Sequence, residues 1–166
     1  HPSRDEVLVG GADGVPQIYR VFRKTVRKIG DNASLIRKFP AMEGRIFGVD
    51  YSADGKMIAA VASLDGRGLI NVYAADFDST MSTNLIKIFE KEVFNQSADE
   101  KAAIEKYLTA DVKLLSSLVI SNASIYAVSF NPDGRTVAAA GDDGQVRLID
   151  AASGRIAKQF KVVPVS

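Results

Sequence analysis

The chain of 166 residues offers few side chains for catalysis. His1 is its single histidine, and it contains no cysteine. Ser-His-Asp and Cys-His catalysis need these residue types beside a nucleophile or a base, and zinc sites draw on the same two types. We therefore predict no catalytic residue, no metal site and no cofactor, and we expect that the protein is not an enzyme.

Two short motifs that resemble ligand sites are better explained as turns. The segment GGADG, residues 10–14, leads into a strand pattern, whereas a phosphate-binding loop leads into the N-terminus of a helix. Asp142 and Asp143 are adjacent acids, but together they supply too few oxygens for a calcium ion.

The basic run along residues 20–38 is the strongest candidate for contact with a partner. Its candidate binding residues are Arg23, Lys24, Arg27, Lys28, Arg37 and Lys38, and its single acid is Asp31. Such a patch suits an anionic partner, or it is a solvated loop and edge strand whose charges prevent edge-to-edge pairing. No aromatic residue falls between Arg23 and Lys38, and the net charge is only +1, so we expect neither nucleic acid nor membrane as partner.

A repeated unit positions these residues. Residues 1–20 align on residues 131–150 without a gap, and a third copy covers residues 52–74. His1 falls on Asn131, which is a turn position. A recurring unit of this length is typical of architectures in which similar modules pack on their neighbours.

Each copy alternates short apolar strands with Asp-Gly turns. Both central residues of a type I′ turn have positive φ, which Asp-Gly favours, so we predict tight hairpins. The turns are Asp13-Gly14, Asp54-Gly55, Asp65-Gly66, Asp133-Gly134 and Asp143-Gly144. Fourth strands are predicted near residues 34–39, 112–118 and 156–162, which makes each copy a four-stranded antiparallel meander.

Residues 130–160 resemble a WD40 repeat, which is one blade of a β-propeller. The motif Phe-x-Pro-Asp-Gly opens the segment, and Asp-Gly-x-Val-x-Leu-Ile-Asp closes its third strand. The aromatic position of the family's Trp-Asp pair carries Tyr19, Tyr73 and Ile149, so the pair is complete in none of the copies. The resemblance implies an all-β fold: a partial propeller of about three four-stranded antiparallel blades with one inserted surface helix.

We expect a single partial propeller over residues 1–166. Its parts are blade one in 1–40, which lacks its first strand, blade two in 45–118, and blade three in 125–163.

A helical insertion is predicted near residues 97–111 of blade two. Ser97 has Glu100 three residues later, which is the pattern of a capping box. Ile104, Leu108, Val112 and Leu115 then follow helical spacing. An alternative places the fourth strand of this blade at residues 84–89, before the helix.

The resemblance implies a non-catalytic protein-interaction scaffold. Propellers close with four to eight blades, so we expect the chain, which opens with His1-Pro2, to be part of a larger protein. Its partners would be another protein, the remaining blades of the same protein, or a second copy that closes the ring. The basic run and the insert at residues 90–111 are the expected contacts.

A second hypothesis places the catalytic residues in other domains. The chain resembles WD40 segments of planctomycete-type multidomain proteins that contain a cytochrome c domain. This resemblance implies a bacterial, extracytoplasmic protein, and an alternative function as the propeller portion of an enzyme or a c-type cytochrome protein. The chain itself has no Cys-x-x-Cys-His motif, so no haem attaches to it.

Overall fold

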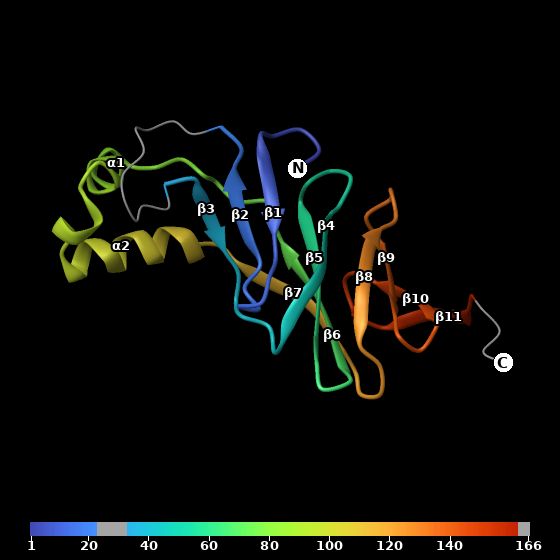
Figure 1. Ribbon diagram of the computed structural model, residues 1–166. Coiled ribbons are helices and arrows are strands. Elements are labelled where there is room, and N and C mark those ends of the chain that lie inside the picture. Colours follow the sequence, from blue (N-terminus) through green and yellow to red (C-terminus); the bar gives the residue numbers. More distant parts are fainter. Residues whose placement is uncertain (23–32, 163–166) are drawn as a thin grey trace.

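A computed structural model describes residues 1–22 and 33–162 of the chain (Figure 1). The described residues form three antiparallel sheets and a helical segment. Sheet one contains β1 (Glu6–Val9), β2 (Gln17–Arg20) and β3 (Leu35–Lys38). Sheet two contains β4 (Arg45–Tyr51), β5 (Met57–Leu64), β6 (Arg67–Ala74) and β7 (Lys113–Ile120). Sheet three contains β8 (Ile125–Phe130), β9 (Thr136–Gly141), β10 (Gln145–Asp150) and β11 (Ile156–Lys161).

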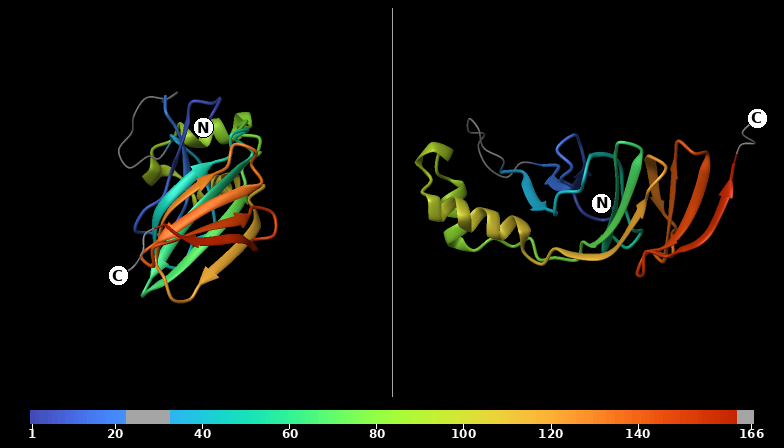
Figure 2. Two further views of the ribbon diagram at one scale, coloured as in Figure 1. Left: turned by 90° about the vertical axis from the view of Figure 1, so that its right-hand side faces the viewer. Right: turned by 90° about the horizontal axis from the view of Figure 1, so that it is seen from below.

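Within every sheet the strands are neighbours in the order of the sequence. The three sheets follow one another in a row, with the helices at one end beside sheet one (Figure 2). Strand β8 packs against β4, so the first strands of sheets two and three lie together. The predicted fold class, a partial WD40-like propeller with an inserted helix, is confirmed.

Separate apolar cores hold neighbouring sheets together. Between sheets one and two, Ile18 and Ile36 meet Ile58 and Tyr73. Between sheets two and three, the buried residues are Ala59, Val61, Ile70, Val72, Ile125, Phe130, Val137, Ala139, Ile149 and Ala151. Sheet two is therefore covered on both faces, which explains why β5 reads Met-Ile-Ala-Ala-Val-Ala, an unbroken apolar run rich in alanine.

The prediction of type I′ geometry is right for one Asp-Gly turn and wrong for the other four. Asp65 and Gly66 both have positive φ, at 49° and 76°, and form a two-residue hairpin loop. In the other four turns only the glycine has positive φ. There the glycine N–H donates to the residue three positions earlier, as Gly134 does to Asn131 at 2.9 Å. These are type I turns that end in a left-handed glycine.

The aspartate of these four turns has a common role. Its Oδ1 accepts the backbone N–H two residues later, at distances of 2.8–3.2 Å, for Asp13, Asp54, Asp133 and Asp143. This side-chain bond satisfies a backbone group that the turn leaves free. Aspartate is thus selected as a hydrogen-bond acceptor, and only glycine is selected for positive φ.

The segment between β6 and β7 is helical. It contains α1 (Thr83–Phe89), a 3-10 helix (Val93–Asn95) and α2 (Ala98–Thr109). The alternative strand at residues 84–89 is wrong, because these residues form α1 and β7 is the fourth strand of sheet two. The capping box is present: Ser97 Oγ accepts from Glu100 N at 3.2 Å, and Ser97 N donates to Glu100 Oε2 at 2.9 Å.

Helix α2 is shorter than its apolar spacing suggested. Asp111 adopts a left-handed conformation with φ of 58°, and the chain then enters β7. Val112 and Leu115 therefore pack in the sheet cores instead of continuing the helix. These two residues share the helical spacing but belong to the strand region, in agreement with the helix predicted near residues 97–111 and the strand predicted near residues 112–118.

Candidate interaction surfaces

Arg37 was predicted to bind a partner, and the structure corrects this: its side chain is fully buried. Lys38 is partly exposed, and its Nζ lies 2.8 Å from Glu105 Oε1 of α2. Both residues thus join β3 to the helical segment. The other four candidates, Arg23, Lys24, Arg27 and Lys28, lie outside the described residues.

The guanidinium of Arg37 binds the C-terminal end of α2. Its Nη1 donates to the carbonyl oxygens of Tyr107 and Ala110, both at 2.7 Å, and its Nη2 donates to Asp78 O at 3.3 Å. The carbonyls at a helix C-terminus lack helical partners and carry partial negative charge, so a cation there is favourable. Phe77 lies under the guanidinium, with 4.0 Å between the ring centroid and Cζ.

Burial of the Arg37 guanidinium disfavours its charged form. Desolvation lowers the pKa of Arg37 from its usual value, while Tyr107, Asp111 and Asp78 act in the opposite direction. The four contacts offset the cost of removing the cation from water. Helix α2 lies between β6 and β7 of sheet two, whereas Arg37 lies on β3 of sheet one. Arg37 therefore joins the helical segment of sheet two to sheet one.

The helical segment, the second predicted contact region, presents a groove and an exposed aromatic side chain. A groove of about 310 Å³ lies between α1 and α2, lined by Leu85, Ile88 and Tyr107 among others. Phe94 is 80 % exposed on the 3-10 helix. The C-terminal end of α2 lies beside β3, the outer strand of sheet one (Figure 1).

Equivalent positions in the three sheets reveal a face of sheet one that the described residues leave uncovered. Val7, Ile58 and Val137 occupy the same position of the repeat, and their exposed fractions are 44 %, 0 % and 0 %. Val9 is 43 % exposed, whereas its counterpart Ala60 is fully buried. Tyr19 pairs with Val7 across the ladder. Val7, Val9 and Tyr19 therefore form the first open face, on the side of sheet one away from sheet two.

Sheet three has an open face on the opposite side. Leu148 stands four residues after its turn glycine, as Ile70 and Ile18 do in the other sheets. Ile18 and Ile70 are buried against the next sheet, whereas Leu148 is partly exposed. Its neighbours on the ladder complete the second open face, which consists of Ala138, Ala140, Val146, Leu148 and Phe160.

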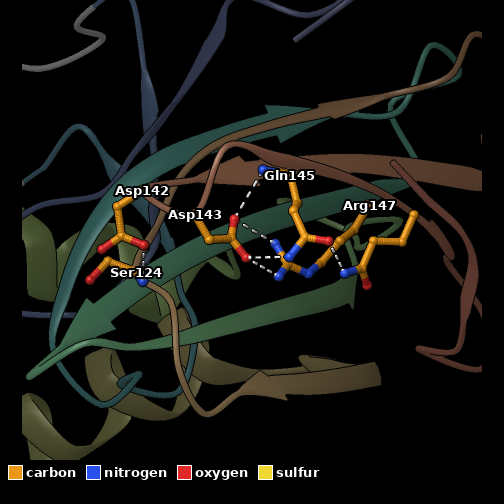
Figure 3. A network of polar contacts seen from close by, with 6 residues as sticks. Ser124, Asp142, Asp143, Gln145 and Arg147 are labelled. Carbon is orange, nitrogen blue, oxygen red and sulfur yellow. Dashed lines mark hydrogen bonds and ion pairs between the residues drawn. The ribbon is translucent and has the colours of Figure 1, made fainter. Parts of the chain in front are cut away.

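Sheet three also contains a polar network that the sequence analysis did not anticipate (Figure 3). Arg147 of β10 is buried and pairs with Asp143, which lies in the turn before that strand. Asp143 also accepts from Gln145 N at 3.1 Å, and the adjacent Asp142 accepts from Ser124 N at 3.0 Å. An arginine four residues after a turn aspartate was the available signal for this pair.

Asp143→Asn is expected to lower the free energy of unfolding by about 2 kcal/mol at pH 7, because Arg147 would stay buried beside a neutral partner. The hydrogen bond from Arg147 holds the pKa of Asp143 below its usual 3.8. The pair therefore stabilises fully above about pH 4 and loses this contribution as the pH falls through the lowered pKa. Urea unfolding at pH 7 and at pH 2 measures both values, and the difference from wild type should shrink at pH 2.

Asp133→Asn provides the matched control, because Asp133 holds the same turn position and accepts from Arg135 N at 2.8 Å. Asparagine retains that acceptor, so this change should cost about 0.5 kcal/mol or less. Equal losses for the two variants would contradict a specific contribution from the Asp143–Arg147 pair.

The described residues bear on the expectations for metal ligands and for His1. Among them, no three His, Asp or Glu side chains gather as metal ligands do. His1 occupies its predicted turn position: its backbone N donates to Glu6 O at 2.9 Å, as Asn131 N does to Thr136 O at 2.8 Å. In the described part of the chain, no helix has the length and apolar character needed to cross a bilayer.

Comparison with known proteins identifies a local match. The family model described as "WD domain, G-beta repeat" matches residues 113–150. No curated protein shows a significant match to the chain. The matched residues begin at β7 of sheet two and end with β10 of sheet three, so the sequence repeat is displaced by one strand from the sheet. The chain is therefore similar to the WD40 repeat in sequence over these residues, and its three antiparallel sheets are consistent with a partial WD40-like propeller.

Proposed function

We propose that the protein is a non-catalytic interaction scaffold whose two open faces each dock a further antiparallel sheet of the WD40 type. One observation supports this proposal above all: positions that are fully buried in sheet two are exposed on one side of sheet one and on the opposite side of sheet three. Wherever a neighbouring sheet is present, it buries these apolar positions. A further sheet is therefore the favoured partner for the two open faces.

The two open faces are complementary. The first open face corresponds in the repeat to the side of sheet two that packs on sheet one. The second corresponds to the side of sheet two that packs on sheet three. A second copy, joined head to tail, would thus reproduce an interface that the structure already contains twice. Additional sheets of a larger bacterial multidomain protein would do the same, as the resemblance to planctomycete-type proteins suggests.

Lysine substitutions on the two faces test this function. The wild-type chain is expected to associate with increasing concentration in light-scattering measurements, and Val9→Lys or Leu148→Lys should each abolish association because a lysine would be buried without a partner. An equimolar mixture of the two variants should recover a dimer, since each retains the face that the other has lost. Asn122→Lys, on an exposed loop, is the control and should associate as wild type does.

A wild-type chain that stays monomeric at every concentration, or a mixture that recovers nothing, would contradict docking of a second copy through these faces and leave further sheets of a larger protein as the occupant. Association of both single variants at wild-type strength would place the contact elsewhere on the molecule.

A further inference from the structure

Strand β1 has an open edge in the described structure. Val21 N donates to Asp5 O at 2.8 Å, and because ladder bonds alternate along an antiparallel pair, Val7 and Val9 also direct their backbone groups toward β2. Leu8 therefore directs its N–H and C=O to the other side. Within the described residues β1 pairs only with β2.

The other two sheets show what occupies this edge. Ala59 of β5 and Ala138 of β9 stand at the position of Leu8. Ala59 is opposite Asp50 of β4, and Ala138 is opposite Ser129 of β8. In each sheet the pairing ends in an equivalent bond, from Ser52 N to Met57 O at 3.0 Å and from Asn131 N to Thr136 O at 2.8 Å. His1 and Glu6 form that bond in sheet one.

A groove lies where the additional strand would run. It has a volume of about 380 Å³ and is lined by His1, Pro2, Val7, Leu8, Val49, Asp50 and Tyr51. The Tyr51 hydroxyl is buried and has no hydrogen-bond partner in the described part of the chain. An incoming backbone would supply hydrogen-bond partners for the free groups of Leu8.

The two existing occupants share one sequence pattern. Residues 46–51 read Ile-Phe-Gly-Val-Asp-Tyr, and residues 125–130 read Ile-Tyr-Ala-Val-Ser-Phe. Phe47 and Tyr126 form an edge-to-face pair with ring centroids 5.0 Å apart. A Cβ on Gly48 would lie 3.2 Å from Tyr126 O, which explains the small residue. An aromatic side chain at the second position of a new strand would extend this row beside Phe47, which is 47 % exposed.

We infer that the open edge of β1 is a strand-addition site for an extended six-residue segment of another polypeptide with the pattern Ile-aromatic-small-Val-polar-aromatic. The main-chain bonds to Leu8 supply affinity, and the alternating side chains that pack on β4 supply specificity. This inference rests on the proposed scaffold function and names the chemistry of one partner.

A labelled peptide tests the site without altering the protein. Its sequence is Ser-Ile-Tyr-Ala-Val-Ser-Phe-Asn, a copy of residues 124–131, with lysines added at both ends for solubility. It is expected to bind the full chain with one-to-one stoichiometry in fluorescence anisotropy, and a scrambled peptide is expected not to bind. N-methylation at the copies of Ala127 and Ser129 should weaken binding by about tenfold or more, because these N–H groups face β9 in sheet three.

N-methylation at the copy of Val128 is the matched control and should preserve binding, since that N–H points away from the ladder. A photoreactive group at the tyrosine position should crosslink to β1 or β4. Absence of binding, equal loss for both N-methylated peptides, or crosslinks confined to β11 would overturn the inference. The lysine variants of the open faces report on the proposed function separately, because they leave the backbone of Leu8 unchanged.

Discussion

Replacing Arg37 with methionine is expected to lower the free energy of unfolding by about 4 kcal/mol. The carbonyls of Tyr107 and Ala110 would lose their donor at 2.7 Å, and Phe77 would lose the cation stacked on it. Methionine has similar length and fits the apolar surroundings, so the loss measures hydrogen bonds and charge more than packing. Urea unfolding gives the free energy, and amide hydrogen exchange over α2 should accelerate well beyond the rest of the chain.

Lys38→Met is the control for this prediction. Lys38 is the next residue of β3, and its ion pair with Glu105 joins the same two elements at a partly exposed site. Such pairs contribute about 0.5 kcal/mol. If the two variants lost similar stability, or if exchange in α2 were unchanged in Arg37→Met, the attachment of α2 to sheet one would not depend on the guanidinium.

Ser63→Ala is expected to cost about 3 kcal/mol, because one hydroxyl satisfies two buried backbone groups. Ser63 Oγ donates to Ile125 O at 3.0 Å and accepts from Ile125 N at 2.8 Å, which links β5 of sheet two to β8 of sheet three. Ile125 is fully buried, so water would not replace the lost partner. Thermal and urea unfolding measure the change.

Ser116→Ala tests whether the double role matters. Ser116 also links sheets two and three, but its Oγ makes one bond, to Ala151 O at 2.7 Å. We expect a loss of about 1 kcal/mol for this variant. Equal losses for the two serines would contradict the importance of bonding both backbone groups of Ile125.

The repeated architecture was accessible from the sequence because it depends on local rules. Paired turns in a gapless alignment predicted the order of strands, and the capping box at Ser97 predicted the start of α2. The turn geometry was predicted less well, since Asp13 or Asp143 contributes a side-chain acceptor instead of positive φ. A dipeptide alone does not distinguish a two-residue loop from a three-residue loop; that depends on strand register.

The contact surfaces were less accessible because they depend on tertiary packing. Arg37 lies in a basic run that reads as solvent-exposed, yet α2, more than sixty residues later, packs over it. The burial of Arg147 likewise depends on the neighbouring sheet. In contrast, the unbroken apolar run of Val7, Leu8 and Val9 indicates a strand with apolar residues on both faces. The structure adds that Val7 and Val9 are exposed.

The helical segment between β6 and β7 also has a consequence for the folding pathway. Strands β4, β5 and β6 are joined by short hairpins, so they can pair early through local contacts. Strand β7 reaches β6 only after a long intervening chain has closed, and that closure is easier once α1 and α2 have shortened the path. Completion of the central sheet is therefore expected to be a late kinetic event, so mutations in α2 should change the refolding rate more than mutations in the β4–β5 hairpin loop change it.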